Sequence, residues 1–411
     1  MNNSNTLQTD AQLSNALQKL LAYCRQNDWA GYDPYDALNS KILKALPIID
    51  SRIPRIAFTQ ALKLSPVNVR GLLGISKTQN SKALAVFLSS FINMSAEQVS
   101  DRDSLIAEMI RLIVAKKSPD SSYWCWGYSF PWQTRFELVP AEAPNLVCTT
   151  FVALALLDAH DQIGDPKCLE MAVSAAEYIV NDLYWTEGGE VAGFSYPQPG
   201  VRSKTHNANL LAAALLCRIY KHTGDAKLLG PALTVARYSV SKQRDDGSWD
   251  YGEAPSQRWI DNFHTGYNLR ALQALCRYAG TSEFESSIHR GFEFYRAHFF
   301  REDGAARYFH DRTYPIDIHS VAESILTLVA FRELDPGNIA LAQSVIHWTM
   351  NHMWDDRGFF YYRVHRLGTI RTSYMRWSQA WMLLAMSTLL RELKVEGRHP
   401  QPQNSVALVQ A

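Results

Sequence analysis

Histidine and arginine side chains recur at the starts of apolar segments that have helical periodicity. His206, His264 and His319 each stand near the beginning of such a segment, and Arg376 stands near the beginning of the last one. Histidine titrates close to neutral pH and can act as acid or base, whereas arginine binds anions such as carboxylates. The four residues are therefore candidates for one shared site, although each could instead cap or pack its own helix.

Three carboxylates lie close to these histidines in the sequence. Asp261 precedes His264 by three residues and Asp317 precedes His319 by two, so both could cap helices or serve in catalysis. Glu323 lies inside an apolar segment, where a carboxylate is costly unless it is paired or faces a wet cavity. We favour a functional role for Glu323, and glycoside hydrolysis would need two such carboxylates at a suitable separation.

Tyrosine and tryptophan side chains extend the candidate site. Tyr267 follows His264 by three residues, which places both on one face of a helix, where Tyr267 could transfer protons. The chain is 11% aromatic, with 11 Trp and 19 Tyr, and exposed rings stack on the faces of sugars. The candidate substrate-binding residues are Arg376, Trp249, Trp377, Tyr251, Arg312 and Tyr314.

The same residues admit more than one reaction. Two carboxylates would suit glycoside hydrolysis, whereas His or Tyr with an arginine would suit proton abstraction beside the carboxylate of a uronate, the first step of epimerases and lyases. Three histidines and an aspartate could also hold zinc or manganese, but the HExxH, CxxC and EF-hand patterns are absent from the sequence. We expect no metal and no cofactor.

A repeating unit positions these candidates. Aromatic loops recur along the chain, and an apolar segment with helical periodicity follows each one. After the first four segments come a turn (IGDP, TGDA, AGTS or LDPG) and a more amphipathic helix, which predicts paired inner and outer helices. The loops are WCWGYSFPW (124–132), GFSYPQP (193–199), GSWDYGE (247–253), ARYFHD (306–311) and GFFYYRV (358–364). The predicted outer helices span 167–183, 226–243, 282–299 and 338–353.

Two further pairings complete the repeat. Residues 82–91 and 103–117 form another predicted pair, and the helix near 12–24 is the predicted partner of the inner-type helix 374–393. Six hairpins whose ends meet predict an all-α, closed (α/α)6 toroid rather than an open solenoid, which would need polar capping repeats. We predict an N-terminal segment, 1–79, that packs on or closes the toroid, a toroid domain, 80–395, and a disordered tail, 396–411. Residues 33–74 have no clear periodicity and receive no role.

Composition limits the classes of function. Lys plus Arg number 41 against 40 for Asp plus Glu, which does not favour nucleic-acid binding. We find no secretory signal and no membrane-spanning segment, and the six scattered cysteines are typical of reduced, buried thiols in a cytoplasmic protein. The oligomeric state is not predicted.

Residues 80–395, with their GSW- and FxY-type loops, resemble the six-hairpin glycosidase-like superfamily of (α/α) toroids. The resemblance implies a carbohydrate-active protein, because that group includes glycoside hydrolases, acylglucosamine epimerases, polysaccharide lyases and glucuronyl C5-epimerases. DNFHTGYNLRAL and HDRTYPIDIHS are similar to segments of bacterial proteins associated with exopolysaccharide synthesis. No active-site motif of the superfamily matches, so no residue role is carried over from it.

A second resemblance concerns KQRDDGSWDYG, which is similar to the Q…GxW loops of terpene cyclases and prenyltransferases. Those enzymes are also (α/α) barrels, but the DxDD motif of one cyclase class is absent here, and no cysteine lies near the histidines. We therefore predict a toroid that acts on a sugar or a uronate-containing oligosaccharide as a hydrolase, epimerase or lyase. The alternatives are a non-catalytic toroid that binds a glycan or a partner enzyme, and a terpene cyclase-like or prenyltransferase-like enzyme.

Overall fold

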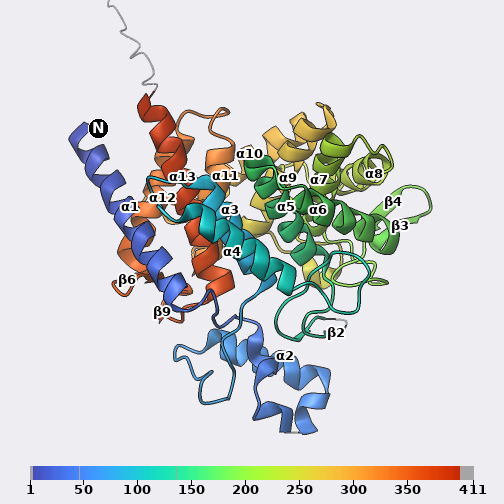
Figure 1. Cartoon of the computed structure of the whole chain (residues 1–411), viewed down its shortest axis with the longest axis horizontal. Coiled ribbons are helices and arrows are strands. Elements are labelled where there is room, and N and C mark those ends of the chain that lie inside the picture. Colours follow the sequence, from blue (N-terminus) through green and yellow to red (C-terminus); the bar gives the residue numbers. More distant parts are fainter. Residues whose placement is uncertain (1–2, 46, 136, 399–411) are drawn as a thin grey trace, which may run out of the picture.

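The longer helices alternate between an inner and an outer layer (Figure 1). The computed structural model describes residues 3–45, 47–135 and 137–398. Each inner helix contacts the next one, and the last contacts the first, so the inner layer is a closed ring. The inner helices are α3 (Ser81–Asn93), α5 (Leu146–Ile163), α7 (His206–Thr223), α9 (Asn262–Ala279), α11 (Ile318–Ala330) and α13 (Ala380–Arg398).

Each inner helix pairs with an outer one. The outer helices are α4 (Arg102–Ala115), α6 (Pro166–Tyr178), α8 (Leu229–Val240), α10 (Glu285–His298), α12 (Asn338–Met353) and α1 (Asn3–Gln26). The predicted (α/α)6 toroid is confirmed, and α1 packs against α13 as the predicted partner of the last inner helix. Most of the predicted tail, 399–411, lies outside the described residues.

Local sequence sets the ends of the helices. Helices α5, α7 and α9 each end at a glycine with positive φ (71°, 72° and 66°), a conformation that other residues rarely adopt. The N-caps of four inner helices accept hydrogen bonds from backbone N–H groups of the first turn, which would otherwise lack partners. These N-caps are Asn80, Asn145, Asp261 and Asp317.

The inner helices form the core of the protein. Helix α5 is long and apolar enough to cross a membrane by length and composition alone, yet most of it is buried inside the toroid. Helix α11 is buried along almost its whole length. An inner helix packed between its neighbours and the outer layer needs apolar side chains nearly all round, which explains both patterns.

Short strands and irregular segments connect the helices. The strands are paired as β1–β2, β3–β4, β6–β7 and β5–β8–β9. Their bounds are β1 (Trp132–Gln133), β2 (Leu138–Val139), β3 (Tyr184–Glu187), β4 (Val191–Phe194), β5 (Ile316–Asp317), β6 (Trp354–Asp355), β7 (Phe359–Phe360), β8 (Arg363–His365) and β9 (Gly368–Ile370). The shorter helical turns are η1 (Asp36–Asn39), η2 (Leu43–Ala45), η3 (Pro47–Asp50), η4 (Ile179–Leu183), η5 (Pro255–Gln257) and η6 (Met375–Gln379), the last leading into α13.

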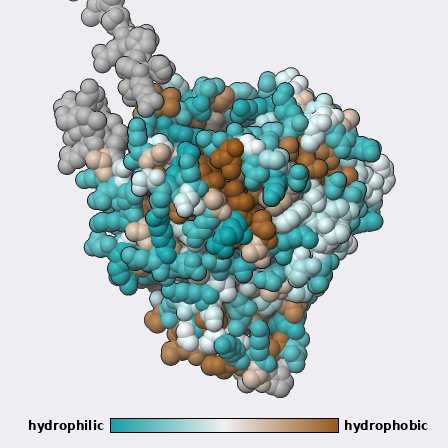
Figure 2. Space-filling view, in the orientation of Figure 1, coloured by the Kyte–Doolittle hydropathy of each residue, from teal (hydrophilic) through white to brown (hydrophobic). Residues whose placement is uncertain are grey.

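Residues 27–80 lie at the end of the ring where the inner helices begin. This segment contains α2 (Arg52–Leu64) and extends below the toroid in Figure 1. Several large apolar side chains of the segment are exposed, and apolar surface shows at the lower edge of Figure 2. They are Ile42, Ile53, Leu64, Val67 and Leu72. We call this end of the ring, which also carries the aromatic loops, the N-terminal mouth.

The opposite end of the ring is hollow. A cavity of about 630 Å³ is lined by the C-terminal parts of all six inner helices. Three rings on its inner side, those of Phe151, Tyr267 and Trp381, contact one another, with centroid separations of 5.3 to 5.7 Å. These rings line the cavity on the side that faces the N-terminal mouth, where Tyr267 also contacts His264 and His319.

Candidate active site

Four side chains occupy equivalent places at the N-terminal mouth. Lys82, Phe263, His319 and Arg376 are the second residues of α3, α9, α11 and η6, respectively. The ring of His319 lies 4.8 Å from that of Phe263 and 4.6 Å from that of Trp377. The equivalent position on successive inner helices thus brings side chains from distant parts of the sequence to one place.

A histidine–carboxylate pair stands at the start of α9. Oδ2 of Asp261 lies 2.7 Å from Nδ1 of His264 and accepts a hydrogen bond from Nε1 of Trp259 at 2.8 Å. Oδ1 of Asp261 caps the helix at the backbone N–H of His264. Asp261 therefore both caps the helix and orients the imidazole. The side chain of His264 keeps 19% of its surface exposed, and no described residue hydrogen-bonds to its Nε2.

A tyrosine–histidine pair lies beside it. The hydroxyl of Tyr267 is 2.7 Å from Nε2 of His319, and Nδ1 of His319 is 3.2 Å from the backbone oxygen of Trp377. That oxygen can only accept, so Nδ1 carries the hydrogen and Tyr267 donates to Nε2. Burial lowers the pKa of His319 well below its usual value and raises the pKa of Tyr267 well above its own. Both side chains are therefore neutral at pH 7.

Asp317 is engaged on both of its oxygens. It caps α11 at the backbone N–H of His319 (2.8 Å) and accepts a hydrogen bond from Nε1 of Trp377 at 2.9 Å. Its other oxygen forms a buried ion pair with Arg363. Asp317 thus positions Trp377 and the helix start rather than facing open space.

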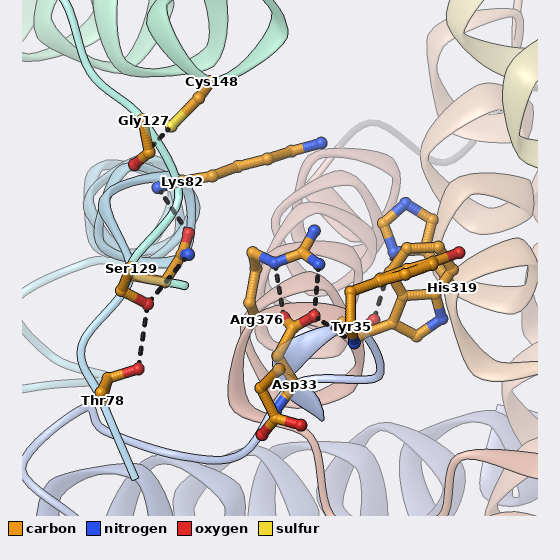
Figure 3. A network of polar contacts seen from close by, with 12 residues as sticks. Asp33, Tyr35, Thr78, Lys82, Gly127, Ser129, Cys148, His319 and Arg376 are labelled. Atoms are coloured by element: carbon orange, nitrogen blue, oxygen red, sulfur yellow. Dashed lines mark hydrogen bonds and ion pairs between the residues drawn. The ribbon is translucent and has the colours of Figure 1, made fainter. Parts of the chain in front are cut away.

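Arg376 is paired with a residue of the N-terminal segment. Its Nε and Nη2 donate to the two oxygens of Asp33 at 2.6 and 2.8 Å, as Figure 3 shows. The sequence left either an anion clamp or an ion pair with Asp317 or Glu323 open for Arg376, and the observed partner is Asp33 instead. The ring of Tyr35 stands edge-on to Trp377 at 5.7 Å, so residues 33–35 help to build the mouth.

Glu323 is held in the wall between two inner helices. Both of its oxygens accept from Nη1 of Arg270, at 2.8 and 2.9 Å, and Thr327 bonds to one of them. Burial raises its pKa, against the opposing effect of Arg270. Gly266 gives it room, since a Cβ there would lie 2.7 Å from Cγ of Glu323. The carboxylate is paired, as its cost in an apolar helix requires, and it does not hydrogen-bond to either histidine.

Four sequence-predicted site residues lie outside this cluster. His206 is buried, and burial lowers its pKa to about 4. Trp249 is buried and donates to the backbone oxygen of Ser239. Arg312 pairs with its neighbour Asp311 on the surface. The fourth, Tyr314, is exposed.

The three predicted histidines stand at different positions of their helices. His206 is the first residue of α7, His319 the second of α11 and His264 the third of α9. The rings of His264 and His319 both adjoin Tyr267. No side-chain hydrogen bond or ring contact joins His206 to any of these three in the described part of the chain, although it too stands at a helix start.

Tyrosines from four aromatic loops surround the cluster. The ring of Tyr251 lies 4.4 Å from His264 and 4.6 Å from Trp259, and Arg376 lies over the ring of Tyr128 at 4.9 Å. Burial raises the pKa of all four phenols, that of Tyr196 to about 12, so they stay protonated at neutral pH. The four are half-buried: Tyr128, Tyr196, Tyr251 and Tyr308.

Sequence reasoning missed Lys82, Asp33 and Tyr35. Lys82 lies in the apolar segment SKALAVFLSSF, so the argument applied to Glu323 would have singled it out as well. Asp33 and Tyr35 belong to a segment without periodicity, which gave no signal. Within the described part of the chain, no group of three His, Cys, Asp or Glu side chains is arranged to hold a metal ion.

Comparisons with known proteins agree with the fold. The sequence matches no protein-family profile, and no curated protein is similar to it. The structure is similar to cellobiose 2-epimerase from Bacillus thermoamylovorans (TM-score 0.60, 13% identity, 78% of this chain and 90% of that one). It is similar to a family 76 α-mannanase from Bacteroides thetaiotaomicron (0.58, 14%, 77% and 86%). A polysaccharide lyase matches almost end to end (0.59, 12%, 98% and 99%). The chain therefore has the six-hairpin (α/α)6 toroid fold of these proteins.

Proposed function

We propose that the protein is a carbohydrate-active enzyme that removes a proton from a sugar carbon, as sugar epimerases and polysaccharide lyases do. The observation that carries the proposal is the juxtaposition of two proton-transfer pairs. His264 with Asp261 and Tyr267 with His319 adjoin one another, and the rings of His264 and Tyr267 are 6.3 Å apart. Two groups able to exchange protons on either side of one carbon are what such chemistry needs.

Each pair has a defined role in this proposal. His264 accepts a proton at Nε2, and the carboxylate of Asp261 stabilises the imidazolium that forms. Tyr267 can accept a proton while passing its own to Nε2 of His319. Half-buried tyrosines supply faces on which a sugar can stack. A lyase needs one such base and a proton for the leaving oxygen, and an epimerase uses both pairs.

Hydrolysis fits the carboxylates less well. A glycosidase needs one carboxylic acid and one carboxylate that face the scissile bond. Asp261, Asp317 and Glu323 are each engaged by helix caps, indole N–H groups or arginines. The protein's acid–base capacity at the mouth therefore resides in His264 and Tyr267.

The similarity to the polysaccharide lyase adds support for an elimination reaction. That match spans 98% of the chain and so includes residues 27–80, whereas the epimerase match spans 78%. Asp33 and Tyr35, which this segment contributes to the mouth, thus lie in a part of the fold that the lyase shares.

The six cysteines form no disulfide among the described residues, and we retain the cytoplasm as the proposed location.

A proton NMR time course in D2O with uronate-containing oligosaccharides tests this function. Loss of the C5–H signal is expected; an accompanying vinyl signal would identify a lyase, and its absence an epimerase. His264→Ala should abolish the exchange, whereas His289→Ala, which removes an exposed histidine of α10, should not affect it. New reducing ends without loss of C5–H would mean hydrolysis and would contradict the proposal.

A further inference from the structure

The amine of Lys82 is buried without a counter-ion. The side chain is 4% exposed, and no described residue accepts a hydrogen bond from Nζ or pairs with it. Nζ lies 4.0 Å from the ring centroid of Phe151, and 5.6 and 5.4 Å from those of Tyr267 and Trp381. Aromatic faces attract a cation, but they do not replace the hydrogen bonds that a buried ammonium requires.

A second buried cation faces the same space. Arg376 uses Nε and Nη2 for Asp33, and Nη1 has no partner among the described residues. Figure 3 shows the end of Lys82 and the free edge of Arg376 extending into the space between α3 and α13, with His319 beside it. Lys82 is also the second residue of α3, where the helix dipole favours an anion.

We propose that Lys82 and Arg376 bind the carboxylate of an acidic sugar residue at the bottom of the N-terminal mouth. This inference deepens the proposed function and rests on it. A carboxylate there would accept hydrogen bonds from Nζ and Nη1, and Tyr267 would stand within reach of the neighbouring carbon. Two cations on that carboxylate stabilise the charge that develops when the adjacent carbon loses its proton. The substrate class is therefore a uronate rather than a neutral sugar.

Binding at this place should be linked to proton uptake. Burial, with a smaller contribution from Arg376, lowers the pKa of Lys82 to about 7. An anion beside Nζ favours the ammonium and raises this pKa, so a neutral Lys82 takes up a proton when the anion binds. The other titratable or charged groups that face Lys82 are Cys148 on α5, Glu323 and His319 on α11, and Asp33 in the N-terminal segment.

Calorimetry in buffers of different ionisation enthalpy measures this uptake. The titrants are trisaccharides of glucuronate, galacturonate or mannuronate and their carboxyl-reduced counterparts, added to the His264→Ala protein so that no turnover interferes. For a lysine of pKa near 7, a uronate should bind with uptake of about 0.9 proton at pH 8 and about 0.1 at pH 6. The carboxyl-reduced sugars should bind with no uptake.

Lys82→Met keeps the length of the side chain and removes its charge. In the same background it should weaken uronate binding by about 10- to 100-fold and abolish the uptake. Lys117→Met is the matched control, because Lys117 also lies over an aromatic ring, that of Trp124, but its amine bonds to the backbone oxygen of Ser121. Unfolding curves recorded alongside show whether each variant is folded.

Several results would overturn the inference. One is that folded Lys82→Met binds uronates with unchanged affinity and unchanged proton uptake. Another is that uronates and their carboxyl-reduced forms bind equally well. The others are that the folded protein binds no uronate, and that inorganic phosphate is the only ligand whose binding is linked to proton uptake. The two proposals fail separately. If the wild type exchanges C5–H but uronate binding is not linked to proton uptake, the carboxylate site is refuted and the proposed function stands. If binding is linked to proton uptake but no C5–H exchange occurs, the proposed function is refuted and the carboxylate site stands.

Discussion

Asp261→Asn probes the histidine–carboxylate pair with the smallest possible change. The native carboxylate accepts three hydrogen bonds, from the backbone N–H of His264, from Nδ1 of the same residue and from Nε1 of Trp259. An amide has one oxygen for these donors. If the amide oxygen faced the side chains of His264 and Trp259, the NH2 group would face the backbone N–H groups of the first turn of α9. Two donors would then oppose each other, and no rearrangement relieves that contact.

We therefore expect the amide oxygen to keep the cap and the NH2 group to face His264. The imidazole can accept from this group only if its hydrogen moves from Nδ1 to Nε2, and the substrate then meets a donor instead of a base. Loss of the correct tautomer in a catalytic histidine lowers kcat by about 10⁴-fold in the best-studied case, and we expect about 10²- to 10⁴-fold here. The unpaired N–H of Trp259 costs about 1–3 kcal/mol of stability.

The assay combines C5–H exchange in D2O with the ¹⁵N shifts of the imidazole, which report the tautomer directly. Asp165→Asn is the control, since Asp165 caps the outer helix α6 in the same way but lies outside the mouth. Full activity in Asp261→Asn with the hydrogen shown to be on Nε2 would refute the reasoning. So would a loss of activity with the native tautomer intact.

Three further outcomes follow from buried groups away from that pair. Glu323→Gln should lower the free energy of unfolding in urea by about 1–3 kcal/mol, because Arg270 loses its buried partner while staying partly solvated. C5–H exchange should persist in this variant, and its complete loss would return Glu323 to the catalytic set. His206 has a pKa of about 4 in the folded protein and is therefore protonated more readily in the unfolded chain, so stability should fall as the pH drops from about 6.5 toward 4. His206→Gln should reduce that fall by up to about 3 kcal/mol, and identical pH profiles of the two proteins would contradict this prediction. Trp249→Phe should cost about 1–3 kcal/mol of stability and leave KM unchanged, whereas a raised KM would place Trp249 at the substrate.

The architecture was accessible to sequence reasoning because it is a repeat. Each inner helix had to be apolar nearly all round, and glycine at the ends of α5, α7 and α9 marked the turns. Even the pairing of α1 with α13, which joins the two ends of the chain, followed from one inner helix that lacked a partner. These signals depend only on local periodicity and on counting.

The candidate site was accessible only in part, because standing at a helix start does not decide which side chains meet. His264, Tyr267, His319 and Asp261 were predicted as candidates and lie together in the structure, but His206 was grouped with them although it is buried at the start of α7 and makes no side-chain contact with them in the described part of the chain. Pairings that cross between segments, such as Asp33 with Arg376, leave no local pattern at all. Lys82 did leave one, as a single charge in an apolar helix.

The three-ring layer of Phe151, Tyr267 and Trp381 limits how a polymer can approach. Neighbouring centroids 5.3 to 5.7 Å apart are in contact, which leaves no passage for a sugar between these three rings. If the substrate is a polysaccharide, as the proposed function implies, it cannot be threaded between these rings and slid along from one turnover to the next. It would then have to present a chain terminus, or a bend of the chain, from the side of residues 27–80 and leave on that same side.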